Sequence, residues 1–309
     1  MLDVVSTNLF IAAVHLSVPL VFAAIGGLLS ERAGVINIAL EGQMLAAAFA
    51  GVAVTWWVDD RVVGLLGAAA VGASLGLVHA WFSVTLRANQ IVAATAINLL
   101  AVGVTAALIR PIWGHPGASE TVGTFATVDV PVLGWIPGPL GDFFSGLSIL
   151  DWVGLALAPV VWVVLFRTPL GLALRACGEQ PRAAASTGID VLRTRYLAVT
   201  MSGMLAGLGG AYLALVQVGV FQRGMTQGRG FLALAAMIFG GWRPLPVLGA
   251  CALFGFADAF QFRAQAEGVD LPHELMLALP YIVALAALAT FAGRAGRVPA
   301  AVGKPYAEE

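Results

Sequence analysis

The chain has 309 residues, of which 60% are hydrophobic and only 11% are charged, and its mean hydropathy is +0.91. Soluble domains carry about 25% charged residues, and a globule of this length could not hide so much apolar surface from water. The composition therefore excludes an ordinary soluble protein and predicts an all-α polytopic membrane protein with one domain over residues 1–309. The net charge of −1 says nothing about partners, and no nucleic acid is expected.

Apolar runs recur along the whole chain, and each is a candidate membrane span. A spanning helix needs about 20 mostly apolar residues, so we expect about eight to ten of them. Segment 230–241 is too short to cross alone and is framed by glycines, which predicts a half-helix or re-entrant element of the kind that borders substrate paths. The candidate spans are 8–29, 36–58, 62–86, 91–110, 150–166, 196–219, 230–241, 245–262 and 276–292.

The positions of the basic residues predict the orientation in the membrane. With segment 167–195 inside, eleven of the 16 lysine and arginine residues lie on the cytoplasmic side, as the positive-inside rule requires. Segment 111–149 is then an extracytoplasmic loop and segment 293–309 a cytoplasmic tail. The outer loop is either a docking surface for an external partner or an interfacial cap on the bundle. The five basic residues left outside are Arg61, Arg110, Arg223, Arg229 and Arg263.

Segment 167–195 is a polar stretch with five arginines between two apolar runs. Leu170, Leu174 and Cys177 recur at helical spacing after Pro169, which predicts a short helix. A plain connection would need only a handful of residues. A long, basic and structured loop therefore predicts a docking site for a soluble partner with an acidic surface.

Two breaks divide this loop. Gly178 can end the first helix, and Pro181 suits the first turn of a second helix. Gly188 suits a left-handed stop, and Asp190 suits the N-cap of the following span. The predicted order is helix, break, helix, break and span, which forms a knob that fits a groove.

Three segments carry a resemblance to a known family. They are LGLALRACGEQPRAAASTGIDVLRTRYLAVTMSGMLAGLGGAYLAL, GGLLSERAGVINIALEGQML and GRGFLALAAMIFGGWRPLPVLGACALFGFADAFQ. The first resembles the coupling loop of ABC importer permeases, and all three are similar to permeases for ribose, other simple sugars and nucleosides. These are relatives of the branched-chain amino acid permeases. The motifs TVGTF and GWRP favour the nucleoside branch, which is paired with basic-membrane-protein lipoproteins.

The resemblance implies an importer built from several chains. One or two ATPase subunits would carry ATP and Mg, a second permease subunit would be identical or paralogous, and an extracytoplasmic lipoprotein would deliver substrate. No cofactor and no metal are expected on this chain, which would be a multi-pass protein of the bacterial cytoplasmic membrane. The residues implied to couple to the ATPase are Leu170, Gly171, Leu174, Arg175, Ala176, Gly178, Glu179, Pro181, Arg182, Ala184 and Gly188.

The sequence also argues against an enzyme. It contains no GxxxxGK[ST] phosphate-binding loop, and its single lysine is Lys304. ATP hydrolysis is therefore expected on a separate subunit. Three rival functions stay open: an ABC permease for ribose or another simple sugar, one for branched-chain amino acids, and, from another class, a stand-alone secondary transporter. The last would explain the spans but not segment 167–195.

Polar residues within apolar spans are candidates for the substrate pathway, because burying them in a membrane costs energy. Gly34, Asn37 and Glu41 have the spacing of one helix face. Glu41 could line the pathway near an inner gate. It could equally pair with Arg32 or cap a broken helix.

A second candidate face lies on span 91–110. Thr95, Asn98 and Thr105 have the spacing of one face, and Asn98 is close to the middle of its span. These side chains can hydrogen-bond to sugar hydroxyls or base edges, but also to neighbouring helices. Asn98 is the strongest single candidate for contact with substrate.

A third candidate set lies on span 245–262 and consists of Phe254, Asp258 and Gln261. A buried carboxylate such as Asp258 could bind a ribose diol by accepting two hydrogen bonds. Alternatively, Asp258 forms an ion pair with Arg229 or Arg263 that fixes the outer ends of the helices.

Small residues mark a close helix contact on span 196–219. Gly203, Gly207 and Gly210 have the spacing that lets helix backbones approach one another. They predict packing within the chain or, alternatively, a seam between two copies. His79 is a lone histidine and is expected to bond to a neighbouring helix rather than to a ligand.

Overall fold

The computed structural model describes residues 7–126, 144–267 and 298–306, together with Ala278, Ile282, Val283, Leu285 and Ala286. Within these residues the regular elements are helices, and Ala118 and Gln222 form one isolated bridge. This confirms the all-α prediction. The candidate span 276–292 lies mostly outside the described residues.

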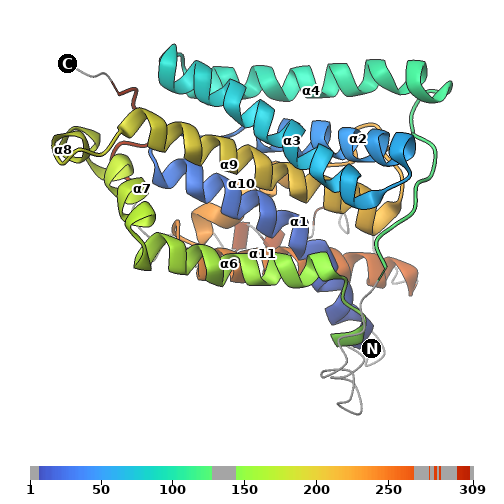
Figure 1. Ribbon diagram of the computed structural model, residues 1–309. Coiled ribbons are helices and arrows are strands. Elements are labelled where there is room, and N and C mark those ends of the chain that lie inside the picture. The colour runs from blue at the N-terminus through green and yellow to red at the C-terminus, as the bar shows by residue number, and fades with distance from the viewer. Residues whose placement is uncertain are drawn as a thin grey trace.

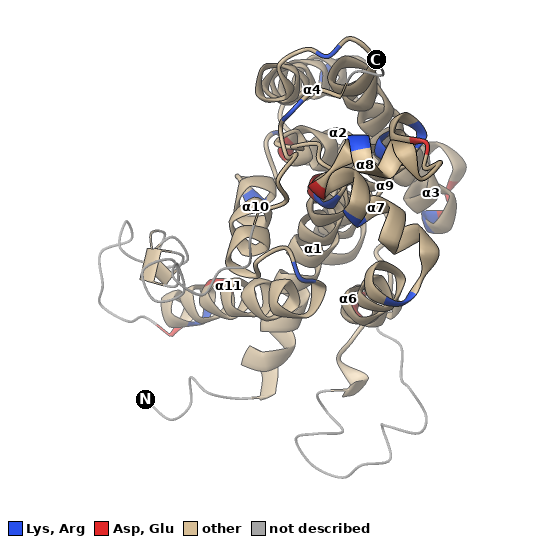
Figure 2. Cartoon of the chain, turned by 90° about the vertical axis from the view of Figure 1, so that its left-hand side faces the viewer, with Lys and Arg blue, Asp and Glu red and all other residues tan. Residues whose placement is uncertain are grey.

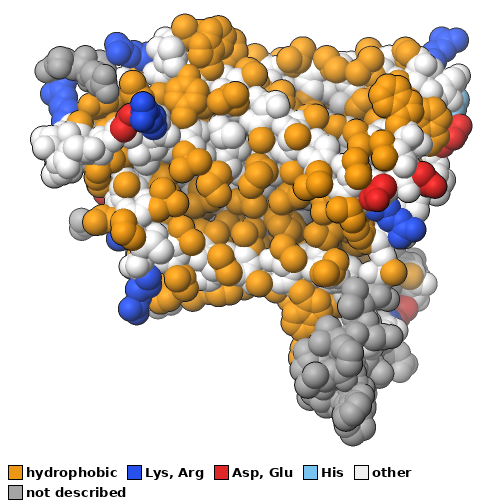
Figure 3. Space-filling model, viewed as in Figure 1, with side chains coloured by type: hydrophobic (Ala, Val, Ile, Leu, Met, Phe, Trp, Pro, Cys, Tyr) orange, Lys and Arg blue, Asp and Glu red, His pale blue; other side chains and the backbone are white. Residues whose placement is uncertain are grey.

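Six helical segments in the described part are long and apolar enough to cross a membrane. On the face shown in Figure 3, apolar side chains cover the middle of the bundle and charged side chains lie toward its two ends. With the six long apolar helices, this makes the chain a polytopic membrane protein. The six segments are α1 (Thr7–Arg32), α3 (Arg61–Ala80) continued by the π-helix η2 (Trp81–Thr85), α4 (Gln90–Trp113), α6 (Ile149–Arg167), α9 (Val191–Tyr212) continued by the π-helix η3 (Leu213–Val218), and α11 (Pro244–Ala266).

Four further helices complete the described part (Figure 1). Two apolar ones belong to the bundle, namely α2 (Leu40–Val58) and α10 (Arg229–Phe239). Two short ones, α7 (Pro169–Glu179) and α8 (Pro181–Ser186), lie together at one end. We call α7 and α8 the knob. The helix, break, helix order predicted for this loop is therefore present.

Helices α1 and α9 form the centre of the bundle. Their most apolar windows are 67% and 72% buried, whereas that of α4 is only 28% buried. Glycines allow the closest contact, because a Cβ atom at Gly203 would overlap the backbone of Gly72 and Gly76 in α3. The small-residue face of α9 thus packs against another helix of the same chain.

The first interruption of the bundle lies between α1 and α2. Residues 34–39 are not helical, and Gly34 has a left-handed φ of +95°. The prediction of a helix from residue 36 was therefore wrong at its start, and Gly34, Asn37 and Glu41 do not share a helix face. The run of apolar residues concealed the break.

The second interruption precedes α10. Residues 219–228 follow η3 without helical structure, and α10 itself has 11 residues. At a rise of 1.5 Å per residue, such a helix spans about half of a hydrocarbon core of about 30 Å. The predicted half-helix is therefore present, with bounds close to those expected.

The two ends of the bundle carry different segments (Figure 1). Residues 298–306 lie at the knob end, where the backbone N–H of Ala301 donates to Gly178 at 2.8 Å and that of Gly303 donates to Gly34 at 3.1 Å. The start of α1, the start of α6 and residues 114–126 lie at the opposite end. The knob and residues 114–126 therefore lie at opposite ends of the bundle.

Candidate functional site

The two interruptions meet at Glu41, in the first turn of α2. Its Oε1 accepts hydrogen bonds from Thr226 Oγ1 at 2.6 Å and from the backbone N–H of Gly228 at 2.8 Å, and its Oε2 accepts from that of Gly230 at 2.7 Å. Helix N-termini favour negative charge, because their first N–H groups have no partner within the helix. Glu41 therefore caps the half-helix α10 from a distant part of the chain.

The contact of Glu41 with α10 lies near the middle of the bundle, because Asn98 of α4 bonds to the residues beside Glu41. Its Oδ1 accepts from the backbone N–H of Gly42 at 2.8 Å, and its Nδ2 donates to the carbonyl of Ile38 at 3.0 Å. Asn98 lies eight residues into α4, which has 24 residues. We call residues 34–42 and 226–230 with Asn98 the junction.

Other helices supply the remaining partners of the first interruption. The backbone N–H of Ile36 donates to Gln90 Oε1 at 2.8 Å, and His79 Nε2 donates to the Ile36 carbonyl at 2.8 Å. Asn37 Nδ2 donates to Ser202 Oγ at 2.9 Å. Backbone without helical structure can lie at membrane depth only when such internal partners exist. His79 thus bonds to a neighbouring segment, as expected.

The junction unites only part of the predicted pathway set. Asn37, Glu41 and Asn98 lie in it, and Asn37 is completely buried. The threonines of α4 lie elsewhere: Thr95 is exposed and Thr105 is buried, and each hydroxyl donates to a carbonyl of its own helix. The predicted shared face of α4 is therefore not a single environment.

The α11 set lies beside α10. Phe254 is buried against Phe239, with ring centroids 5.8 Å apart. Asp258 is half-buried and interacts electrostatically with Arg229. Arg263 forms an ion pair with Glu267 at 2.9 Å, and an ion pair of Asp258 with Arg229 or Arg263 stays a prediction.

Arg229 was assigned to the outer side, but it begins α10 directly beside the Glu41 cap. This position could not be derived from hydropathy, because it depends on how the second interruption returns into the bundle. Gln261 lies in α11, as predicted, and is buried at 4% exposure.

The contact at the other end of α10 was not predicted from the sequence. Arg32 was considered as a partner of Glu41, but its Nε and Nη2 donate to the carbonyl of Trp242 at 2.8 and 2.6 Å. The indole N–H of Trp242 in turn donates to Glu31 Oε2 at 2.6 Å. The charged pair 31–32 at the end of an apolar run was the available signal.

A polar cluster at the end opposite the knob was also missed. His15 Nδ1 lies 3.1 Å from Asp151 Oδ2 and 2.9 Å from the hydroxyl of Tyr212, which also donates to Asp151. These residues come from three helices, so no local motif reveals them. A cavity of about 430 Å³ adjoins the cluster and is lined by Ala12, His15, Leu16, Phe125, Ser148, Val216 and Gln217.

The knob is held tightly against the bundle by two glycines. A Cβ atom at Gly171 would overlap the backbone of Leu165, and one at Gly178 would overlap the carbonyl of Arg32. Gly178 lies within α7, which continues to Glu179, so the prediction that it ends the helix was wrong. Its lack of a side chain serves close approach instead.

The second half of the loop follows the predicted chemistry. Pro181 opens α8, and Gly188 adopts a φ of +88° after this helix. Asp190 Oδ1 accepts from the backbone N–H of Arg193 at 2.9 Å and caps α9.

The predicted coupling residues differ in exposure. Those on the outer surface can meet a partner, and Figure 2 views the bundle from this end, around which basic residues gather. Arg175 is partly covered, because its guanidinium lies 4.9 Å from the ring centroid of Phe166. Leu170, Glu179, Arg182 and Gly188 are exposed, Arg175, Ala176 and Pro181 are half-buried, and Gly171, Leu174, Gly178 and Ala184 are buried.

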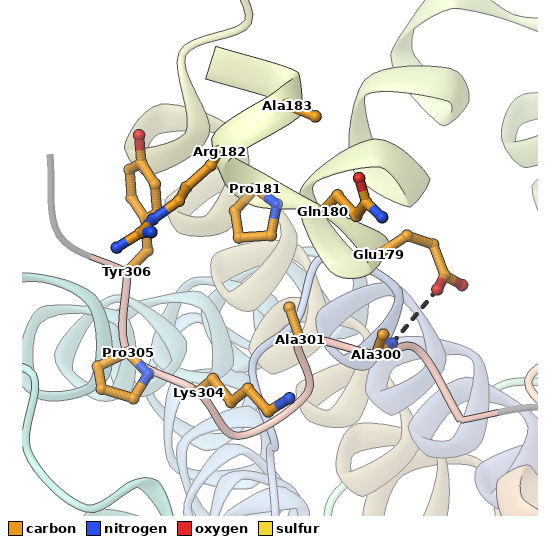
Figure 4. Close-up of a pocket in the computed structure, with 10 residues that line it drawn as sticks. All are labelled: Glu179, Gln180, Pro181, Arg182, Ala183, Ala300, Ala301, Lys304, Pro305 and Tyr306. Atoms are coloured by element: carbon orange, nitrogen blue, oxygen red, sulfur yellow. Dashed lines mark hydrogen bonds between the residues drawn. The ribbon is translucent and has the colours of Figure 1, made fainter. Parts of the chain in front are cut away.

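A cavity of about 500 Å³ separates the start of α8 from the tail. In Figure 4, Arg182 and Tyr306 lie together at one side of it, and Glu179 lies at the other, where it accepts from the backbone N–H of Ala300 at 3.3 Å. Beneath the tail, Arg195 is 1% exposed and donates to the carbonyls of Ala33 and Lys304. Arg195 is therefore structural and not part of the exposed basic surface.

A family model described as "Branched-chain amino acid transport system / permease component" matches residues 9–288. The chain belongs to this permease family. It is 39% identical to the guanosine ABC transporter permease protein NupQ of Bacillus subtilis over 296 residues, covering 93% of this chain and 92% of the relative.

Two further relatives are similar over most of their length. The nucleoside ABC transporter permease protein NupC of Lactococcus lactis is 36% identical over 95% of this chain and 96% of its own. A putative glucose ABC transporter permease protein of Haloferax volcanii is 36% identical over 88% of this chain and 82% of its own. No solved structure matches the chain significantly. The expected resemblance to ABC importer permeases is confirmed, and this permease is a multi-pass transport subunit of the plasma membrane.

Proposed function

We propose that this permease is the membrane-spanning subunit of an ATP-driven ABC importer that carries nucleosides into the cell. The observation that carries the proposal is the similarity to permeases named for guanosine and for nucleosides, which extends over more than nine tenths of both chains. The similarity to a putative glucose permease favours a simple sugar as the second candidate substrate.

The proposed importer contains several other chains. An ATPase subunit with ATP and Mg docks on the knob from the cytoplasm, while this permease holds no cofactor of its own. A second permease subunit, identical or paralogous, completes the pathway. An extracytoplasmic lipoprotein delivers substrate at the end that carries the His15 cluster and its cavity of about 430 Å³.

The surface chemistry of the knob supports ATPase docking. Exposed Leu170 and Leu172 offer apolar contact, and exposed Arg182 offers charge for an acidic groove. The close backbone contacts at Gly171 and Gly178 hold the knob against α6 and α1. A force on the knob therefore acts directly on helices of the bundle.

The junction supports a permissive pathway. The polar atoms of Glu41 and Asn98 already bond to backbone groups of the junction. A substrate passing Glu41 or Asn98 would therefore find few hydrogen-bonding groups without a partner. Selectivity then resides mainly in the lipoprotein.

Radiolabelled uptake tests the proposal. Cells with and without the chain would receive a purine nucleoside, a pyrimidine nucleoside and ribose. Arg182→Glu at the knob would be compared with Arg223→Glu. Arg223 is an exposed arginine whose backbone N–H donates to Gly117, in the segment at the opposite end. We expect chain-dependent nucleoside uptake that falls only with Arg182→Glu, at equal membrane levels.

Other outcomes separate the rivals. Uptake of ribose without nucleosides would keep the ABC permease and assign it to sugars. Uptake could instead be unchanged by Arg182→Glu and by ATP depletion, but stop with an uncoupler of the proton gradient. This result would identify a secondary transporter and reject ATPase docking.

A further inference from the structure

The end of α10 that faces the knob is fastened to α1 through Trp242. The side chain of Trp242 donates to Glu31, and its carbonyl accepts two hydrogen bonds from Arg32. Trp242 is only 5% exposed. We call Glu31, Arg32 and Trp242 the latch, because two adjacent residues of α1 hold one residue at its side chain and at its backbone.

The backbone of Trp242 adopts a conformation that bulky residues avoid. Its φ is +54° and follows the +59° of Gly241. A left-handed conformation at a large side chain persists only when its surroundings hold it. The three hydrogen bonds of the latch supply that restraint, so the end of α10 is fixed at a defined place.

The knob rests on the same point of α1. Gly178 of α7 lies so close to the carbonyl of Arg32 that a Cβ atom would overlap it. Arg175 and Glu179 of α7 act electrostatically on the Arg32 guanidinium. A displacement of α7 therefore acts directly on the residue that holds the Trp242 carbonyl.

The far end of α10 lies at the junction, where Glu41 caps it. The latch and the Glu41 cap are thus the two ends of one helix of 11 residues. A short helix moves as a rigid unit when one end is displaced. Movement at the latch consequently changes the geometry at the middle of the membrane.

We infer that Glu31, Arg32 and Trp242 are positioning residues that pass the movement of the knob to the half-helix α10. The inference rests on the proposed docking of an ATPase at the knob. It assigns to α10 the role of the moving element, and to the latch the role of joining it to the ATP-driven step.

The test uses this permease assembled with its ATPase, and a cysteine at Ile238 as a reporter. Ile238 lies near the latch end of α10 and is 42% exposed, whereas both native cysteines, Cys177 and Cys251, are buried. Maleimide labelling of Ile238→Cys would be timed with and without ATP and vanadate. Trp242→Phe removes the indole N–H but keeps the ring, and Glu31→Gln is the matched control because its amide oxygen still accepts.

We expect ATP and vanadate to change the labelling rate in the parent and in Glu31→Gln, and to change it about tenfold less in Trp242→Phe. ATP hydrolysis should persist in Trp242→Phe while uptake per ATP falls by about the same factor. A purely structural role would instead lower hydrolysis and uptake together.

The opposite results overturn the inference. An unchanged ATP-dependent response in Trp242→Phe would show that the latch carries no movement, and so would a parent that hydrolyses ATP without any response at Ile238→Cys. Loss of ATPase binding in Trp242→Phe would assign the latch to assembly. If nucleosides are not taken up but the labelling response follows the latch, the substrate proposal fails and the latch stands.

Discussion

The junction and the knob both concentrate polar residues in a mostly apolar chain, but they use them in opposite ways. In the junction, Glu41 accepts three hydrogen bonds and Asn98 bridges two backbone groups, all within the protein. In the knob, Glu179 and Arg182 reach the surface. The polar atoms of Glu41 and Asn98 are thus bonded inside the protein, whereas the knob carries polar side chains on the protein surface.

Polar residues inside apolar runs can be explained by the interrupted helices beside them. An interrupted helix leaves N–H and C=O groups without partners, and the membrane offers none. Polar side chains are then required to complete the fold, whether or not substrate passes by. We therefore expect changes in the junction to damage folding, and changes at the knob surface to damage association at constant stability.

The largest effect is expected for Glu41→Ala. The change leaves the N–H groups of Gly228 and Gly230 and the hydroxyl of Thr226 without their acceptor. At about 1 to 3 kcal/mol for each of the three orphaned groups, the free energy of unfolding should fall by about 3 to 9 kcal/mol. Thermal unfolding of the purified permease in detergent measures it.

Glu120→Ala is the matched control, because Glu120 is exposed and should cost less than about 1 kcal/mol. A Glu41→Ala variant that unfolds like the parent but no longer transports would contradict the assignment of the junction to folding. Glu41 would then serve substrate rather than the N-terminus of α10.

An intermediate effect is expected for Gly178→Ala. The new Cβ atom would overlap the carbonyl of Arg32, so α7 must move outward. Such overpacking costs about 1 to 3 kcal/mol, and copurification with the ATPase should decrease further than stability alone explains. Gly188→Ala is the control, since it introduces left-handed strain in open space without displacing α7. Equal loss of copurification in both variants would show that the close contact of α7 with Arg32 is not the cause of the loss.

The smallest effect is expected for Thr95→Val. Thr95 is exposed, and its hydroxyl donates to the carbonyl of Ile91 in the same helix. Stability should change by less than about 0.5 kcal/mol, and uptake should be unaffected. A strong loss of uptake with unchanged stability would return the exposed face of α4 to the substrate pathway.

The bundle helices were predictable because hydropathy depends on local composition. Spans 91–110, 150–166 and 245–262 differ from α4, α6 and α11 by at most four residues at either end. The break at residues 34–39 was not predictable in this way, because Ile36 and Ile38 are as apolar as their helical neighbours. Gly34 and Asn37 were the only local signs of it.

The contacts of the candidate site could be found only from the three-dimensional structure. The contact of Glu41 with Gly230 and that of Glu31 with Trp242 join residues about two hundred positions apart. Gly178 shows a similar limit, since a glycine that ends a helix and one that admits another backbone look identical in a sequence. The two helices of segment 167–195 were predictable because their signals, Pro181 and Asp190, act on their immediate neighbours.

The short length of α10 has a consequence for biosynthesis. Eleven residues are too few to enter a bilayer as an independent span, so α10 depends on helices that are already inserted. Its cap, Glu41, is synthesised long before Gly230. The ribosome thus delivers the acceptor first and the helix that needs it later, and α10 joins a bundle whose earlier helices, α1 to α9, have already been synthesised.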